Sequence, residues 1–256
     1  MVETPDKRRS SVSGIGIGIG YRASADSVWS APSYTPAPMT SPTVSLHSIG
    51  VRKPGALILR SIDLDLPAGS ATALFGSNGS GKTTLLRVVA TLLRPSSGSG
   101  TVLGAALGSA ETDSVRRRIG LIGHEPALYP NLTLAENAEL AASIALGRPA
   151  RSEAHHALEQ VGLAAAADRR ASRCSNGMRR RVEFARMLII APDLLLLDEA
   201  HVGLDPEAWR LVSHLISNVT GRGGSALVVA HEEERVRPLV DHTTTLVDGV
   251  LAGNQS

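Results

Sequence analysis

The feature that most constrains the fold of this chain is a glycine-rich segment, GSNGSGKTT, at residues 76–84. It fits the pattern G-x-x-x-x-G-K-[ST], in which glycines let backbone N–H groups turn toward phosphate oxygens. The apolar run SATALF precedes it and the amphipathic run TTLLRVVATLL follows it, which predicts a strand, a loop and a helix. A plain glycine-rich turn is the alternative, but this context favours a phosphate loop in an α/β fold.

Each residue of this loop has an expected part in binding a nucleotide. We expect Lys82 to bridge the β- and γ-phosphates of ATP, and the Thr83 hydroxyl to ligate Mg²⁺. The predicted nucleotide contacts are Gly76, Ser77, Asn78, Gly79, Ser80, Gly81, Lys82, Thr83 and Thr84.

A second part of the predicted site follows the run DLLLLDEA at residues 193–200. Strands that are apolar on both faces lie in the middle of parallel sheets. Asp198 is the expected partner of Mg²⁺, and Glu199 is placed to polarise an attacking water as the general base. Acids end strands in many α/β folds, but the phosphate loop upstream favours the catalytic interpretation.

Residues 44–253 are predicted to form one domain, and composition excludes some function classes for it. The formal net charge of +2 does not favour nucleic-acid binding, and a single cysteine, Cys174, excludes an internal disulfide. No apolar run approaches the ~18 residues that a membrane-spanning helix needs, so membrane attachment would require a partner.

Strands are predicted in TVSLHSIGV, ALILRSIDLDL, GTVLGAAL (100–107), SALVVAH (225–231) and TTTLVDGVLAG, and helices at 134–146 and 153–161.

Residues 1–43 differ from this domain in composition. Ser, Pro and Gly dominate them, and no amphipathic period is sustained, which predicts a disordered extension. The GIGIGIG alternation is not the apolar core of a signal peptide. A transit peptide is a weaker alternative, because Glu3, Asp6 and Asp26 interrupt the basic character.

The segment CSNGMRRRVEFARM at 174–187 resembles the signature segment of ATP-binding cassette (ABC) proteins, LSGGQ followed by a basic helix. Ser175 and Gly177 match that pattern. Asn176 replaces the first glycine of its pair and adds side-chain bulk near the phosphates. The alternative is a Ser-capped amphipathic helix in which the arginines at 179–181 form a solvated face.

Two further segments follow in the order of the ABC family. HVGLDPE at 201–207 resembles the D-loop through Gly203, Leu204 and Asp205, and His231 resembles the switch histidine that contacts the γ-phosphate. A histidine that ends a strand is also common as a structural residue. The resemblance covers about residues 44–253.

The resemblance implies a P-loop NTPase fold: a RecA-like core with an antiparallel β edge, plus a helical ABC subdomain at about 125–188. It also implies an ATPase coupled to transmembrane transport, as a head-to-tail homodimer. Each ATP would lie between the phosphate loop of one subunit and Ser175 and Gly177 of the other. The implied partner is an integral membrane permease, which would hold the chain at the cytoplasmic face of the inner or plasma membrane.

The segment LIGHEP at 121–126 places His124 where ABC proteins carry the Q-loop glutamine, which touches Mg²⁺ and the attacking water. A Gly-His pair here resembles the ATP-binding subunit of the haem exporter of cytochrome c biogenesis. The region expected to hold the aromatic residue that stacks on adenine reads VRKPGAL, with no Tyr or Phe, so Arg52 is the residue expected to cover the base. An arginine in this region also resembles that branch. A neutral substitution at His124 is the alternative.

Three other functions stay open at this point. An export cassette for drugs, lipids or polysaccharides fits the same motifs, because the permease selects the cargo. ABC ATPases that act on ribosomes or DNA usually carry two cassettes, unlike this chain. A cassette with degraded catalysis would explain His124 and Asn176, but Lys82, Glu199 and His231 argue against it.

Overall fold

The computed structural model describes residues 41–200 and 205–255. Most of the predicted extension and residues 201–204 of the segment resembling a D-loop lie outside the described residues. The strands of the described part are β1 (Val44–Lys53), β2 (Ala56–Leu66), β3 (Ala71–Phe75), β4 (Ser97–Val102), β5 (Ala105–Ala106), β6 (Ile119–Ile122), β7 (Leu194–Asp198), β8 (Ser225–Val229), β9 (His242–Val247) and β10 (Val250–Gln255). Its α-helices are α1 (Lys82–Val89), α2 (Thr112–Val115), α3 (Leu134–Leu146), α4 (Arg151–Gln160), α5 (Asn176–Ile190), α6 (Pro206–Gly221) and α7 (Glu233–Val236).

A six-stranded sheet in the order β10-β9-β3-β8-β7-β6 forms the core. The strands β9, β3, β8, β7 and β6 pair in parallel in this order. Within the sheet, β10 alone runs antiparallel, and it pairs with β9. β7 is buried at every position, as its unbroken run of leucines predicts for a central strand. The α/β fold predicted from the phosphate loop is confirmed, as is the P-loop NTPase core that the resemblance implied.

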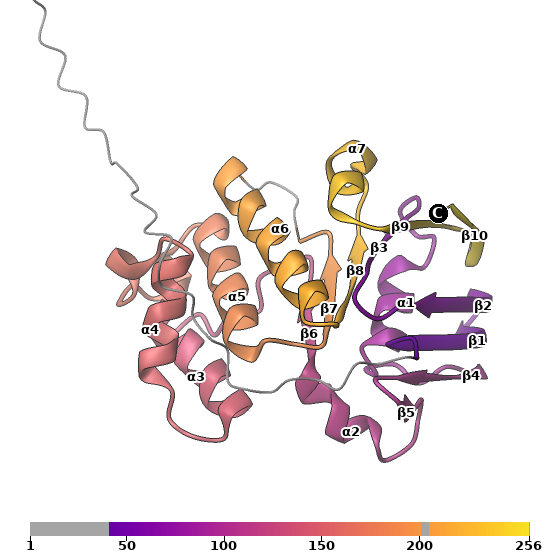
Figure 1. The fold of residues 1–256 in the computed structure, drawn as a ribbon, viewed down its shortest axis with the longest axis horizontal. Coiled ribbons are helices and arrows are strands. Elements are labelled where there is room, and N and C mark those ends of the chain that lie inside the picture. Colours follow the sequence, from indigo (N-terminus) through magenta and orange to yellow (C-terminus); the bar gives the residue numbers. More distant parts are fainter. Residues whose placement is uncertain (1–40, 201–204, 256) are drawn as a thin grey trace, which may run out of the picture. The chain divides into compact units, whose positions relative to one another are not determined.

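The two faces of the core sheet are covered by different elements. Successive side chains of a strand point to opposite faces. Leu195 and Leu197 accordingly pack with α5 and α6, whereas Leu194 and Leu196 pack with α1 and with β1 and β2. Figure 1 shows α3, α4 and α5 grouped on one side of the core sheet and the second sheet on the other.

That second sheet has the order β2-β1-β4-β5 and is antiparallel, which confirms the predicted antiparallel edge. The single strand predicted at 100–107 is wrong. The chain turns back between β4 and β5, where Leu103 has φ 50° and Gly104 has φ 84°. Two successive residues with positive φ form the tight turn that joins antiparallel strands.

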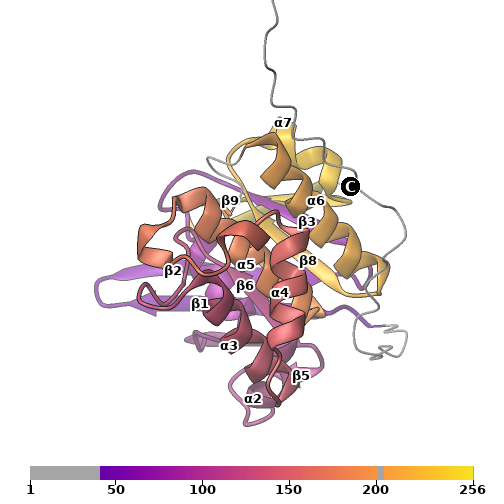
Figure 2. The same ribbon diagram turned by 90° about the vertical axis from the view of Figure 1, so that its left-hand side faces the viewer.

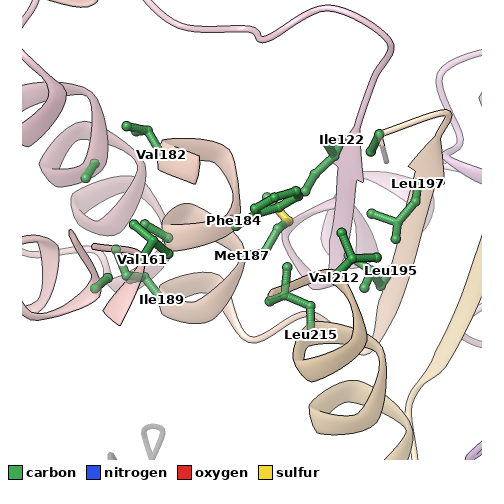
Figure 3. Packing of buried hydrophobic residues seen from close by; sticks show 14 of the residues in the cluster. Ile122, Val161, Val182, Phe184, Met187, Ile189, Leu195, Leu197, Val212 and Leu215 are labelled. Carbon is green, nitrogen blue, oxygen red and sulfur yellow. The ribbon is translucent and has the colours of Figure 1, made fainter. Parts of the chain in front are cut away.

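The helices α3, α4 and α5 pack on one another as a group, which faces the viewer in Figure 2. α3 spans residues 134–146 as predicted. Alanines of α3 and α4 are buried together with Leu158: Ala135, Ala138, Ala142, Ala154 and Ala157. α5 joins this group to the core sheet: its Phe184 and Met187 point toward Ile122 of β6, as Figure 3 shows. The domain limits of 44–253 and about 125–188 stay predictions.

Three differences from the sequence prediction concern α1, β6 and α6. α1 ends at Val89 rather than near residue 93, because Thr91 takes a φ of 59° and the Leu92 N–H bonds the Arg87 carbonyl, as at a helix end closed by a left-handed residue. β6 and α6 were not predicted. Among the described residues, no helix combines the length and the apolar character needed to span a membrane.

A capping box begins α3. The Thr133 hydroxyl accepts the Glu136 N–H at 3.1 Å, and the Glu136 carboxylate accepts the Thr133 N–H at 2.7 Å. The backbone N–H of Thr133 and, second, its side chain lower the pKa of the Glu136 carboxyl from its usual 4.5.

We predict that Thr133→Ala lowers the free energy of unfolding by about 1 kcal/mol at pH 7, measured by urea denaturation, whereas Thr133→Ser retains most of it. The pKa of Glu136 is lowered in the folded state. The ionised carboxylate therefore stabilises the fold fully above pH 4.5, and this stabilisation is lost as the pH falls through the pKa of the folded state. The stability difference between the wild type and Glu136→Gln should therefore shrink in acid. A difference that grows in acid would contradict the capping box.

Candidate active site

The candidate site lies at the carboxyl end of the core sheet, where four neighbouring parallel strands end. Ile122 of β6 is in register with Leu197 of β7, and Asp198 is in register with Val229 of β8. Val229 is in turn in register with Leu74 of β3. The loops that leave these four strands therefore begin side by side, and each carries residues of the predicted site (Figure 1).

The loop after β3 has a backbone that only glycine adopts easily. Gly76, Gly79 and Gly81 have φ values of 148°, 82° and 109°. A Cβ at Gly76 would lie 2.3 Å from the Leu246 carbonyl oxygen, whereas a Cβ at Gly79 would meet no atom within 4 Å. The Lys82 ammonium group donates to the carbonyls of Gly76 and Ser77 at 2.8 and 2.9 Å. The lysine side chain thus joins the end of the loop to its beginning.

The residues of this loop fit a phosphate chain with a bound cation. An open cavity of about 260 Å³ is lined by Asn78, Gly79, Gly81, Lys82, Thr83, Thr84, Glu199 and Ile58. The hydroxyl of Ser80 is buried and has no hydrogen-bond partner among the described residues. Ser80 is not among the residues that line the cavity, so its predicted contact with the nucleotide stays a prediction. Thr83 is exposed and lines the same cavity, so its hydroxyl is available to a cation there.

Glu199 lies directly after β7 in a strained backbone conformation. Its φ is 52°, which a non-glycine residue rarely adopts, and its N–H donates to the Val229 carbonyl of β8 at 3.1 Å. Such strain persists only where surrounding structure imposes it, and it gathers at functional sites. Asp198, the preceding residue, is buried at the end of β7.

Two histidines flank the carboxylate of Glu199, one at each oxygen. His231 Nε2 lies 2.5 Å from Oε1, and His124 Nδ1 lies 3.7 Å from Oε2. His231 follows β8 and His124 follows β6, so the carboxylate lies between the loops of the strands on either side of β7. The structure thus brings together His124, Glu199 and His231, which belong to three separate segments of the sequence.

Ser175 and Gly177 lie elsewhere, at the start of α5. The Ser175 hydroxyl caps the helix by accepting the Met178 N–H at 3.2 Å, and both residues are exposed. Neither lines the cavity beside Lys82. The Asn176 side chain accepts a hydrogen bond from Arg179, one turn along the same helix.

Sequence reasoning missed two features of the site. Ile58 of β2 lines the cavity, and Arg52 is not among its lining residues. The interpretation of the arginines at 179–181 as a solvated face is wrong for Arg180, which is only 6% exposed. Nothing local marks either feature, because Ile58 and Arg180 meet their surroundings through contacts between distant parts of the chain.

Comparison with known proteins agrees with this geometry. Residues 59–202 match the family model described as ABC transporter. The chain belongs to the ABC transporter family. It is an ATP-binding cassette of the ATPase type, and ATP and Mg²⁺ are the cofactors of such a cassette.

The similar relatives serve different transport systems. The chain is 34% identical to the daunorubicin/doxorubicin resistance ATP-binding protein of Streptomyces peucetius, over 82% of this chain and 64% of that protein. It is 36% identical to the lipoprotein-releasing system ATP-binding protein of Anaeromyxobacter dehalogenans, over 85% and 95%. A cytochrome c biogenesis ATP-binding export protein of Cupriavidus metallidurans is 34% identical, over 76% and 92%. The resemblance to the haem exporter is therefore one of several and is not specific.

Solved structures share the fold. A dimeric ATP-binding cassette in a post-hydrolysis state with ADP and Pi has a TM-score of 0.75 at 25% identity, over 83% of this chain and 98% of that chain. The ATP-binding subunit of another ABC transporter has a TM-score of 0.76 at 23% identity, over 84% and 90%. The second likeness concerns the fold alone.

We predict that Gly76→Ala and Gly79→Ala differ sharply. Gly79→Ala meets no neighbour and should cost about 1 kcal/mol of unfolding free energy, the strain of a left-handed alanine. Gly76→Ala places a methyl group against the Leu246 carbonyl, so it should cost more and weaken ATP binding by about tenfold or more. Urea denaturation and titration with a fluorescent ATP analogue measure the two effects. Equal losses in both variants would contradict the close approach described at Gly76.

Proposed function

We propose that this chain is the ATP-hydrolysing subunit of a membrane ABC transporter, and that its site residues act as their positions suggest. The observation that carries this proposal is the carboxylate of Glu199, flanked by His124 and His231 and lining the same cavity as the Lys82 loop. A general base must lie within reach of the water it activates and of the phosphate under attack. Glu199 has such a place on the cavity wall.

Each residue then has one role in hydrolysis. The Lys82 ammonium exchanges its two loop carbonyls for phosphate oxygens and stabilises the charge that develops on the transferred group. Glu199 accepts the proton of the attacking water, and His231 orients that carboxylate and contacts the γ-phosphate. Thr83 and Asp198 would hold Mg²⁺, which when bound neutralises charge on the phosphates.

His124 acts from the other side of the carboxylate. Its ring is 66% exposed and can donate or accept a hydrogen bond toward the water that Glu199 activates. In this proposal it replaces the glutamine of other cassettes as the group that orients that water. The alternative of degraded catalysis is disfavoured, because Lys82, Glu199 and His231 are all in place.

The chain works as a head-to-tail homodimer in this proposal. Ser175 and Gly177 are exposed at the N-terminus of α5, where unpaired backbone N–H groups favour an anion. They do not line their own cavity, so they are available to the γ-phosphate of ATP bound to a second copy. An integral membrane permease is the further partner, and it holds the dimer at the cytoplasmic face of the inner or plasma membrane.

The cargo that we propose is haem for c-type cytochrome biogenesis. His124 after Gly123 carries this choice, together with the relative of Cupriavidus metallidurans. A drug, lipid or polysaccharide exporter is the second candidate, favoured by the relative that serves daunorubicin and doxorubicin resistance. No nucleic acid is expected as a partner, given the net charge of +2.

Lys82→Ala, made in the native host, tests the function and the cargo. It removes the charge that holds the transferred phosphate, so ATP hydrolysis by the purified transporter should fall by about 100-fold or more. Membrane proteins stained for covalently bound haem should lose their bands while the apoproteins stay at normal levels. Loss of hydrolysis with unchanged haem staining would reject haem and favour the second candidate; unchanged hydrolysis would reject the ATPase proposal itself.

A further inference from the structure

A buried ion pair lies in α5, within the segment at 174–187 that resembles the ABC signature and its basic helix. Arg180 and Glu183 are 6% and 3% exposed, and Arg180 Nη1 lies 2.7 Å from Glu183 Oε2. The pair is separate from the phosphate cavity, which neither residue lines. Burial raises the pKa of Glu183, so the protein bears an energetic cost to keep this charge inside.

The same two side chains bind the backbone of the loop that follows β6. Arg180 donates to the Gly123 carbonyl at 2.7 Å and also to the His124 carbonyl. The second oxygen of Glu183 accepts the Ala127 N–H at 2.9 Å. Arg186, further along α5, donates to the Ala127 carbonyl at 2.9 Å. Three charged side chains of one helix therefore hold the loop segment 123–127 at both of its ends.

His124 lies inside this held segment. Its ring is largely exposed, and within the described part of the chain its one ion-pair contact is the 3.7 Å approach to Glu199. The ring position therefore depends on where the backbone of residue 124 lies, and Arg180 bonds that backbone directly. A loop carbonyl that moves by even about an ångström would move the ring relative to the carboxylate.

Stability alone gives little reason for such a pair. A buried ion pair repays the loss of hydration only when further hydrogen bonds satisfy it, and apolar replacements are often equally stable. Arg180 and Glu183 use their remaining donors and acceptors on the 123–127 backbone rather than on their own helix. These partners indicate that the pair positions the 123–127 segment.

We propose that Arg180 and Glu183 are positioning residues for ATP hydrolysis, which fix the 123–127 segment on α5 and so set where His124 lies relative to Glu199. The inference rests on the proposed ATPase function and extends it. Because α5 begins at the exposed Ser175 cap, a displacement of this helix by a second copy bound there moves His124 as well. Nucleotide at one site of the dimer would thereby reach the catalytic base of the other.

The chain offers a matched control in Arg222. Like Arg180, it donates to two successive backbone carbonyls, those of Ala191 and Pro192 at 3.2 Å each. It is half-buried, and burial lowers its pKa. The two carbonyls that it binds follow the C-terminal end of α5, away from the loop of His124. Arg222→Lys therefore removes an equivalent clamp without touching the site.

The test compares Arg180→Lys with Arg222→Lys in the purified transporter. Lysine keeps the charge but cannot bond two carbonyls in the fixed geometry of a guanidinium. Arg180→Lys should lower kcat about tenfold, with KM for ATP changed less than about twofold, because a small misplacement of a catalytic group slows chemistry and leaves binding intact. Arg222→Lys should change neither constant. Equal kinetic effects of the two substitutions, or a change confined to KM, would overturn the proposal.

A double-mutant cycle and a spectroscopic readout complete the test. In a His124→Ala background, Arg180→Lys should cause no further loss of kcat, whereas additive losses would show that Arg180 does not act through His124. The ring NMR signal of His124, assigned by its absence in His124→Ala, should shift in Arg180→Lys and in Glu183→Gln but not in Arg222→Lys. An unmoved signal would overturn the proposal. A wild type without ATP hydrolysis would reject the proposed function alone, since the NMR signal still tests the clamp.

Discussion

The site depends on the parallel register of β6, β7, β8 and β3. Backbone hydrogen bonds between these strands align Ile122, Leu197, Val228 and Ala73 in one row across the sheet, so four loops leave the sheet at its carboxyl end. The register is held from both faces, because alternate leucines of β7 pack into different clusters. A slip of one residue would exchange the leucines between the two clusters and would displace Asp198 from its place at the end of β7. The residues of the candidate site owe their proximity to that alignment.

Much of this arrangement could be predicted from sequence, because parts of it are local. The glycines around Lys82 and the acids at the end of an all-apolar strand are contiguous patterns, and each has few physical explanations. The remaining parts are not local. β6 has four residues with Gly120 among them, too short a run and too weak a strand former to stand out. A Cβ added at Gly120 would lie 2.7 Å from the Met187 sulfur and 2.8 Å from Cγ of Pro192, so a larger residue there would displace its neighbours.

The surroundings of the arginines at 179–181 also could not be predicted from the sequence. In sequence they form a charged run, which is usually solvated. In the structure Arg180 is buried against the loop of His124, and Arg181 pairs with Asp205 and Glu207 at the start of α6. These contacts span 24 to 57 positions of the chain, so no short pattern reveals them. α5 is thus bonded to the segment that follows β6 and to the start of α6, so its position affects both.

The most direct test is a crystal structure of the Glu199→Gln variant with ATP and Mg²⁺. Without the base, ATP should persist, and we expect it between two copies arranged head to tail. Each ATP should contact Lys82 of one copy and Ser175 and Gly177 of the other, with His124 and the substituted side chain at position 199 facing the γ-phosphate. ATP bound away from the Lys82 loop would contradict the assignment of the site. ATP bound in that loop with no second copy against it would contradict the proposed dimer.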